Sequence, residues 1–377
     1  QRFYKNYYRM TDKVRHVLGI SGGKDSAALA IYLHKKYPSL DVEYYFCDTG
    51  KELDETYKLI DNLEIYLGKK IDKRKAAADS SQEPFDHFYH LFGGYLPSSS
   101  ARWCTKYLKL YPFESFVGDG PVVSYVGIRG DEDREGYISK KSNIQSIFPF
   151  RKNIWSEDVI SKVLSNNSID TLTEIYQFHF GNKSSERALE IVSKPLSPKF
   201  TQTQKLNLLL DWGTKEFNRA VLEILKTTNY PLGAVQEFVL VENEDVLVRD
   251  DIFSLLRTSG VGVPQYYEKM TFEVDGKKGE YARSRSGCYF CFFQQKIEWV
   301  WLYEQHPGLF QLAMQYENEK ERFTWNQSES LHELMQPERV EAIKRDFLNR
   351  NKSKSKSSYL LDILDDAESE GCAACFI

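Results

Sequence analysis

The sequence has no apolar run that approaches the ~20 residues needed to cross a bilayer as a helix. It has six cysteines among 377 residues, too few for a disulfide framework in a chain of this size. The first residues, QRFYKNYYRMTDK, are polar and aromatic, unlike the apolar segment of a secretory signal. We therefore expect a cytoplasmic protein that does not associate with a membrane.

Charge of one sign is not in excess either. The sequence has 50 Lys and Arg residues and 54 Asp and Glu residues, which gives a formal net charge of −4. This balance gives no support for bulk nucleic-acid affinity, so binding to a phosphate backbone would need a local basic patch. Two candidates are residues 69–75 and 351–356. Both segments are also typical of solvated faces or linkers, and this alternative stays open.

The most informative stretch is SGGKDS at residues 21–26. It follows a short apolar segment at 17–20 and opens an amphipathic run at 27–33. A strand, a glycine-rich turn and a helix start form the geometry in which backbone N–H groups converge on an anion. Gly22 and Gly23 allow positive φ angles and a close approach of the main chain to a phosphate.

The other residues of this turn also suit a phosphate. Ser21 and Ser26 add hydroxyl donors, and Lys24 adds a positive charge. Asp25 is unusual beside a phosphate unless it orients Lys24 or a Mg²⁺ ion. The turn is not a Walker A loop, because G-x-x-x-x-G-K-[ST] is absent.

Strands and helices alternate over the first part of the chain. The predicted strands are 14–20, 42–47 and 121–128, and the predicted helices are 26–37 and 53–67. This alternation predicts an α/β fold with a parallel sheet and helices on both faces. In such sheets ligands bind beyond the carboxyl ends of the strands, where SGGKDS, Asp48-Thr49-Gly50 and GIRGDE (127–132) all lie in this prediction.

The rest of the chain differs in composition, and four parts are predicted. They are an α/β domain at 1–155, a helical insertion at 156–258, a helical part with a C-x-x-C motif that completes the core at 259–348, and a basic linker with a cysteine tail at 349–377. A helix pair interrupted at 306–307 is expected after the C-x-x-C motif.

Two further strand ends carry candidate binding residues. Asp48 and Thr49 can bind the adenosine part of ATP or a metal-bound phosphate, although a plain turn is the alternative. Arg129, two residues after Gly127, can hold a phosphate or sulfate bidentately, as a lysine cannot. The alternative for Arg129 is a structural ion pair with a neighbouring carboxylate, Glu132 or Asp133.

The cysteines include two C-x-x-C pairs, a pattern that indicates metal ligation or redox chemistry. The six positions are Cys47, Cys104, Cys288, Cys291, Cys372 and Cys375. Cys47 is expected to fill the end of a buried strand, with a sulfur-carrier role as the alternative. The tail pair, 372 and 375, can ligate a metal, accept a persulfide or lie on a mobile tail.

The combination of SGGKDS, DTG, R-x-C, GIRGDE and SGC-x-x-C over much of residues 14–317 resembles the PAPS-reductase-like branch of PP-loop ATP pyrophosphatases. Within that branch it is similar to the ATP-pyrophosphatase component of bacterial DNA phosphorothioation systems (DndC and SspD type). The resemblance implies a PP-loop fold (adenine nucleotide alpha hydrolase-like), a doubly wound parallel sheet, here with a helical insertion and a cysteine-rich C-terminal part.

The resemblance also implies a reaction. ATP binds with Mg²⁺ nearby, an acceptor oxygen attacks the α-phosphorus, pyrophosphate leaves, and a sulfur nucleophile later displaces AMP. Lys24, Asp25 and Arg129 are the implied catalytic residues. The implied nucleotide contacts are Ser21, Gly22, Gly23, Lys24, Asp25, Ser26, Asp48, Thr49, Gly127 and Arg129.

An iron–sulfur cluster is implied as well. Related reductases that hold a [4Fe–4S] cluster often have two adjacent cysteines where this chain has Cys104 and Thr105. Three thiolates then remain for a cluster that usually takes four, and Cys372 or Cys375 can supply the fourth. The implied ligands are Cys104, Cys288, Cys291, Cys372 and Cys375, with Zn²⁺ as the alternative metal.

The implied partners are a cysteine desulfurase and other modification subunits, with DNA reached through the complex. Three alternatives stay open. A PAPS or adenylylsulfate reductase would use Cys372 or Cys375 as its nucleophile and would not cleave ATP. A tRNA thiolase would be stimulated by tRNA rather than DNA. A non-catalytic nucleotide-binding module would bind ATP without releasing pyrophosphate.

Overall fold

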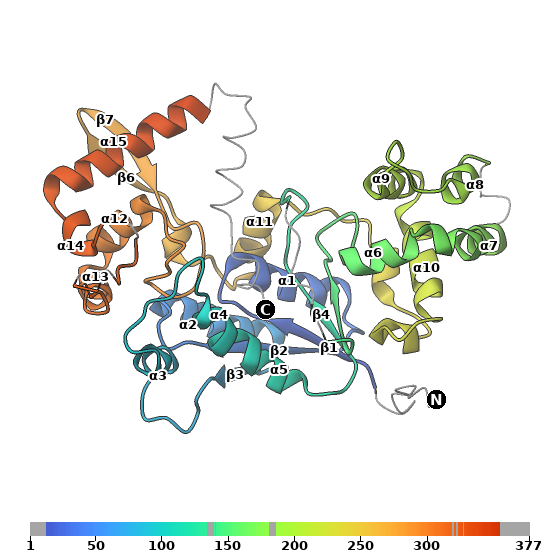
Figure 1. Cartoon of the computed structure of the whole chain (residues 1–377), viewed down its shortest axis with the longest axis horizontal. Coiled ribbons are helices and arrows are strands. Elements are labelled where there is room, and N and C mark those ends of the chain that lie inside the picture. Colours follow the sequence, from blue (N-terminus) through green and yellow to red (C-terminus); the bar gives the residue numbers. More distant parts are fainter. Residues whose placement is uncertain are drawn as a thin grey trace. The chain divides into compact units, whose positions relative to one another are not determined.

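The computed structural model describes residues 13–133, 139, 141–180, 186–318, 320–321, 323–326 and 328–354. Its elements are labelled in Figure 1. The chain divides into two compact units, which are described separately. Unit 1 comprises Gln1–Gly19, Ala28–Tyr44 and Val117–Ile252, and unit 2 comprises Ile20–Ala27, Tyr45–Phe116 and Phe253–Ile377.

The central element is a five-stranded parallel sheet in the order β3-β2-β1-β4-β5. Its strands are β1 (Arg15–Gly19), β2 (Val42–Asp48), β3 (Ile71–Lys75), β4 (Val122–Tyr125) and β5 (Ile144–Ile147). The order reverses at β1, and such a switch point is where open α/β sheets bind ligands. The predicted parallel sheet is confirmed.

Two strands of the sheet were not predicted, each for a physical reason. In β3 only Ile71 is buried, and the other residues, DKRK, are polar. A strand at the edge of a sheet needs few apolar side chains, so its sequence lacks the apolar pattern from which strands are predicted. In β5 the sequence IQSI is short, although all four residues are buried.

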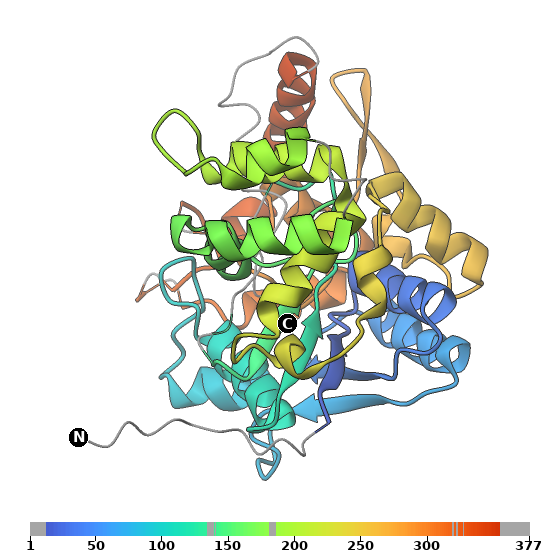
Figure 2. The ribbon, with the colours of Figure 1, turned by 90° about the vertical axis from the view of Figure 1, so that its right-hand side faces the viewer.

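In unit 1, the segment from 156 to 258 is helical, as predicted, and Figure 2 shows these helices in green and yellow. They are α6 (Glu157–Val163), α7 (Ile169–Phe180), α8 (Glu186–Ser193), α9 (Gln202–Trp212), α10 (Thr214–Leu225) and α11 (Arg249–Ser259), the last of which runs on into unit 2. α10 lies at the centre, in contact with α7 and α9. Its buried positions Phe217, Val221, Ile224 and Leu225 follow helical spacing.

In unit 2, helices from two distant parts of the chain pack on one aromatic core. The N-terminal part supplies α2 (Asp54–Leu67), α3 (Pro84–Leu91), α4 (Trp103–Thr105), a π-helical turn (Lys106–Leu110) and α5 (Tyr111–Val117). The C-terminal part supplies a hairpin, β6 (Met270–Val274) and β7 (Lys277–Tyr281), and α12 (Lys296–Gln305), α13 (Pro307–Met314), α14 (Leu331–Leu334) and α15 (Pro337–Lys354). Phe85, Trp103, Phe290, Trp299 and Trp325 are buried together in this core. The predicted interruption at 306–307 separates α12 from α13 and is confirmed.

One expected feature is different in the structure. Residues 349–354, expected to begin a basic linker, are instead the end of α15, which runs to Lys354. Lysine and arginine are good helix formers, and positive charge at a helix C-terminus is favoured by the helix dipole. Of the helices in the described ranges, none combines the length and the apolar character that a membrane span requires.

Candidate functional site

In the turn after β1, one of the two glycines expected to allow a positive φ adopts it. Gly22 has a φ of +74°, which favours glycine over every other residue. A Cβ atom at Gly22 would lie 2.2 Å from Cγ2 of Thr56 on α2. Gly22 is therefore required twice over, by backbone conformation and by space. α1 (Lys24–Lys36) then begins at the end of the turn.

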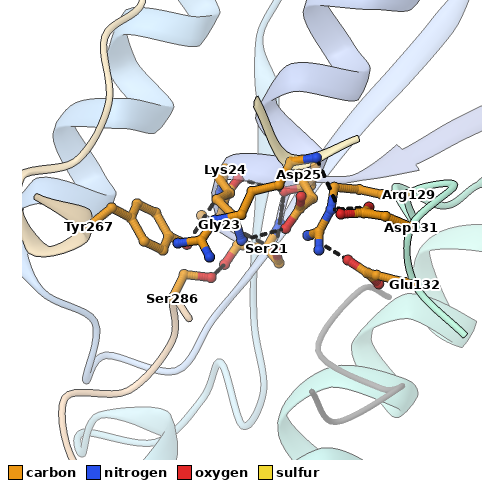
Figure 3. Close-up of polar contacts among 12 residues, drawn as sticks. Ser21, Gly23, Lys24, Asp25, Arg129, Asp131, Glu132, Tyr267 and Ser286 are labelled. Atoms are coloured by element: carbon orange, nitrogen blue, oxygen red, sulfur yellow. Dashed lines mark hydrogen bonds and ion pairs between the residues drawn. The ribbon is translucent and has the colours of Figure 1, made fainter. Parts of the chain in front are cut away.

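The backbone N–H groups of this turn point to hydroxyl oxygens. Ser21 N donates to Ser26 Oγ at 3.1 Å, and Gly23 N donates to Ser21 Oγ at 3.4 Å. Lys24 N donates to the hydroxyl of Tyr267 at 3.3 Å, as Figure 3 shows. Contacts of 3.3–3.4 Å are at the weak end for N–H···O bonds. An anion at the start of α1 would offer these donors a stronger, charge-assisted acceptor.

The charges of the turn are paired within it. Lys24 Nζ lies 3.0 Å from Asp25 Oδ2, and both side chains are buried. Lys24 Nζ also lies 5.2 Å from the centre of the Tyr267 ring, within the range of a cation–π contact. The proposed role for Asp25, orienting Lys24, agrees with this geometry.

Three residues far along the chain also contact this turn, and no sequence motif predicted them. Tyr266 donates a hydrogen bond from its hydroxyl to Gly22 O at 3.0 Å. Ser286 Oγ lies 3.4 Å from Ser21 O, and the Tyr267 hydroxyl accepts the hydrogen bond from Lys24 N. Burial raises the pKa of Tyr267 to about 12, and the nearby charge of Asp25 adds to this rise. The two adjacent tyrosines, 266 and 267, end the loop sequence SGVGVPQYY (259–267) and were the available signal. Their position in the sequence does not indicate what they contact.

The Asp48-Thr49-Gly50 turn follows β2 and is held by its own hydrogen bonds. Asp48 Oδ1 accepts hydrogen bonds from Gly50 N and from the Tyr57 hydroxyl, both at 2.9 Å. Thr49 Oγ1 donates to Glu52 Oε1 at 2.6 Å. Burial raises the pKa of Glu52, and the neighbouring charge of Asp48 raises it further. These contacts agree with the plain-turn alternative for Asp48 and Thr49.

This turn also lies beside the C-x-x-C segment. Thr49 Oγ1 is 3.2 Å from Cys288 Sγ, and Tyr289 N donates to Lys51 O at 2.9 Å. Burial raises the pKa of the Cys288 thiol well above its ordinary value, and the charge of Glu52 adds to the rise. Cys288 is therefore held as a neutral thiol in this environment.

A pocket in unit 2 brings three of the predicted ligands together. Cys104, Cys288 and Cys291 all line it, together with Thr49 and with aromatic side chains that include Phe85, Phe290, Phe292, Phe293 and Trp325. Cys104 comes from α4 and the other two from the segment before α12. The predicted grouping of these three cysteines at one pocket agrees with the structure.

The three thiols are not arranged as a metal centre in the described part of the chain. Across the residues with described positions, no group of three or more His, Cys, Asp or Glu side chains is arranged to hold a metal ion. The aromatic lining of the pocket supplies no other ligand. Cys372 and Cys375, predicted to provide the fourth ligand, lie outside the described residues. The described side chains therefore provide no evidence for an iron–sulfur cluster or a zinc ion, and the five-cysteine ligand set stays a prediction.

Cys47 lies at the end of β2 and is buried. Burial raises the pKa of its thiol to about 12, and Sγ lies 3.6 Å from Lys109 O. A thiol that stays protonated at neutral pH is a poor nucleophile. Cys47 therefore fits the expected packing role better than the sulfur-carrier alternative.

The GIRGDE segment in unit 1 follows β4, and its arginine is bound to its own neighbours. Arg129 is buried, with Nε 2.8 Å from Asp131 Oδ1 and Nη1 in an ion pair with Glu132, as Figure 3 also shows. Gly130 N donates to Leu247 O at 2.9 Å. The ion pair considered as the alternative for Arg129 is thus present, with Glu132 as predicted and Asp131 in addition. Gly127 lies buried before it.

Residues 15–180 match the model of the phosphoadenosine phosphosulfate reductase domain. The chain is also 32% identical over 160 residues to an uncharacterized protein of Methanocaldococcus jannaschii. This alignment covers 39% of the chain and 31% of the relative, so the chain spans about a third of the length of the curated relative it matches.

The matched range contains the turn at 21–26, Asp48-Thr49-Gly50, Cys104 and the GIRGDE segment, and it ends before the C-x-x-C motif at 288–291. The predicted resemblance to the PAPS-reductase branch of PP-loop proteins is thus supported at the level of this domain. Similarity to the DNA phosphorothioation component has no support from these comparisons and stays a prediction.

Proposed function

We propose that this protein is a nucleotide-dependent enzyme that cleaves ATP between its α- and β-phosphates and adenylates an acceptor for sulfur insertion. The observation that carries the proposal is the turn at residues 21–24. It combines a glycine of positive φ, three backbone N–H groups held only by hydroxyls, and a buried lysine at the start of a helix. The match to the phosphoadenosine phosphosulfate reductase domain supports a nucleotide as the ligand of this turn.

The chemistry follows from this arrangement. ATP enters as its Mg²⁺ complex, and its phosphate oxygens replace the weak hydroxyl acceptors of Gly23 N and Lys24 N. An oxygen of the acceptor attacks the α-phosphorus, and the bond from the α-phosphorus to the bridging oxygen breaks. Pyrophosphate leaves with that electron pair. Fixed N–H groups and the ammonium of Lys24 stabilise the charge that builds on the transferred group and the leaving group, while Asp25 orients Lys24.

The acceptor proposed here is a non-bridging oxygen of the DNA backbone, with sulfur supplied by a cysteine desulfurase. A formal net charge of −4 gives little electrostatic attraction to DNA. We therefore propose that partner subunits provide most of the DNA contacts.

A second candidate is a reductase that binds a sulfonucleotide at the same turn. The family match favours it directly, since that domain is named for phosphoadenosine phosphosulfate. Such a reductase needs a reactive cysteine. Cys47 and Cys288 are poor candidates, because burial raises the pKa of both thiols.

One product analysis separates these functions. The purified protein is incubated with ATP and Mg²⁺, with and without DNA, and the nucleotides are resolved. AMP with pyrophosphate is the expected result, and ADP with phosphate would contradict the proposal. A parallel incubation with phosphoadenosine phosphosulfate and a thiol reductant tests the second candidate, for which sulfite is the diagnostic product.

A further inference from the structure

A buried arginine in unit 2 has no role in the site described so far. Arg283 is 2% exposed. Its Nη2 donates to Cys288 O at 3.1 Å, but Nε and Nη1 have no hydrogen-bond partner among the residues with described positions. Within the part of the chain that the structure describes, no carboxylate pairs with Arg283. A buried guanidinium without an anion is strongly destabilising, and the neutral groups around Arg283, which are the Cys288 carbonyl and the Tyr266 and Trp301 rings, compensate its charge only in part.

Arg283 lies next to the residues that contact the turn at 21–24. Its backbone N donates to Tyr266 O at 2.9 Å, and its guanidinium carbon is 5.9 Å from the centre of the Tyr266 ring. Tyr266 and Tyr267 in turn place their hydroxyls against Gly22 O and Lys24 N. Burial raises the pKa of both tyrosines, and the positive charge of Arg283 partly opposes that rise in each.

The segment that follows Arg283 forms one wall of the turn. Ser286 Oγ lies 3.4 Å from Ser21 O, and a Cβ atom at Gly23 would lie 2.6 Å from the same Oγ. The bond from Arg283 Nη2 to Cys288 O closes the segment on itself. The guanidinium is thus held by one hydrogen bond to a short segment, and Ser286 of that segment lies against Gly23.

A second residue with a buried donor lies near the guanidinium. Trp301 is buried, and the centre of its ring is 5.9 Å from the guanidinium carbon of Arg283. Its Nε1 also has no hydrogen-bond partner. Buried donors of native proteins are nearly always satisfied, so three unsatisfied N–H groups around one cation indicate a bound acceptor.

We propose that Arg283 binds the pyrophosphate part of ATP and of the released product, completing the anion site that begins with the N–H groups at 21–24. The inference rests on the proposed function. A guanidinium forms charge-assisted bonds to phosphate oxygens, and a dianionic or trianionic group would neutralise the buried charge. The site then favours a pyrophosphoryl group over a single phosphate.

The test measures the affinity of inorganic pyrophosphate and of AMP, each with Mg²⁺, by titration calorimetry on the full chain. Arg283→Met should weaken pyrophosphate binding about 10-fold to 100-fold, the range for lost hydrogen bonds to a charged group. AMP affinity should change little, since AMP lacks the β- and γ-phosphates. Arg345→Met is the matched control, because Arg345 forms an exposed ion pair with Asp275.

Arg283→Lys keeps a positive charge and should recover part of the pyrophosphate affinity. If the methionine variant does not fold, the lysine variant alone tests whether Arg283 binds pyrophosphate. It should bind pyrophosphate more weakly than the wild type. Pyrophosphate affinity equal to that of the wild type in either folded variant would overturn the inference. An equal loss of AMP affinity would also overturn it, because that result indicates a structural role only.

The failure of this inference is distinct from the failure of the proposed function. If the wild type converts ATP to AMP and pyrophosphate while Arg283→Met binds pyrophosphate normally, only the assignment of Arg283 is wrong. If the wild type binds pyrophosphate through Arg283 but converts ATP to ADP, only the cleavage assignment is wrong.

Discussion

Cys288 Sγ lies 3.2 Å from Oγ1 of Thr49, although the two residues are 239 positions apart in the chain. The contact joins the turn after β2 to the segment that carries the C-x-x-C motif. It also places the cysteine pocket against a turn that follows a strand of the central sheet. The segment 283–291 therefore contacts two turns, the one at Thr49 and, through Ser286, the one at Ser21.

Gly22→Ala should destabilise the fold and abolish nucleotide binding. The new Cβ atom would lie 2.2 Å from Thr56 Cγ2 at a φ of +74°. We expect a loss in the free energy of unfolding of more than about 1 kcal/mol, measured by urea denaturation. Gly68→Ala is the matched control, because Gly68 also has a positive φ of +60° but a Cβ atom there would meet no described residue within 4 Å. If both variants lose the same stability, the contact with Thr56 is irrelevant.

Lys24→Met should eliminate pyrophosphate release and also lower stability, since it leaves the buried carboxylate of Asp25 without this cation. Removing one partner of a buried pair costs about 3–5 kcal/mol. The double variant Lys24→Met/Asp25→Asn removes both charges and should regain stability without regaining activity. Activity in the double variant would show that Lys24 does not act on the phosphates.

Tyr267→Phe should tighten pyrophosphate binding. Its hydroxyl accepts the N–H of Lys24 at 3.3 Å, and in our proposal a phosphate oxygen must displace it. Losing a competing neutral hydrogen bond of about 0.5–1.5 kcal/mol predicts a roughly 2-fold to 10-fold gain in affinity, measured by calorimetry.

Tyr266→Phe is the control for Tyr267→Phe. It removes a donor to Gly22 O and leaves that carbonyl without this bond, so it should lower stability and give no gain in affinity. Weaker pyrophosphate binding by Tyr267→Phe would mean that the hydroxyl contacts the ligand instead of competing with it.

Lys205 should give the protein a distinctive dependence of stability on pH. Its Nζ donates to Val192 O and Lys194 O at 2.7 and 2.8 Å, and burial lowers its pKa to about 8. The unfolded chain, with an ordinary lysine pKa near 10.5, binds more protons than the folded state between these values. The contribution of Lys205 to the free energy of unfolding therefore rises as the pH increases from about 8 to 10.5.

Urea denaturation at several pH values, on the wild type and on Lys205→Met, tests this prediction. Other groups titrate equally in both proteins, so the difference between the two curves isolates Lys205. As the pH rises from about 8 to 10.5, the free energy of unfolding of the wild type should increase relative to that of Lys205→Met. A difference independent of pH would show that the pKa of Lys205 is not lowered.

Local sequence was sufficient where local chemistry decides the structure. The strand before residue 21, a glycine of positive φ and a helix after the turn were all predicted, because each depends on a few adjacent residues; the helix begins at Lys24, two residues before its predicted start. The interruption between α12 and α13 was predicted for the same reason, since Pro307 lacks the N–H that a continuous helix requires. The β3 strand was missed because its charged residues carry no apolar periodicity.

The sequence by itself determined the parallel sheet, the glycine-rich turn and the cysteines as candidate ligands, because composition and spacing are local properties. Only the tertiary structure decided which distant groups meet that turn. Tyr266, Tyr267 and Ser286 contact it from a segment more than 240 positions away, and burial then sets their hydrogen bonding. Such contacts depend on how the chain returns to the turn, which no pattern of neighbouring residues specifies.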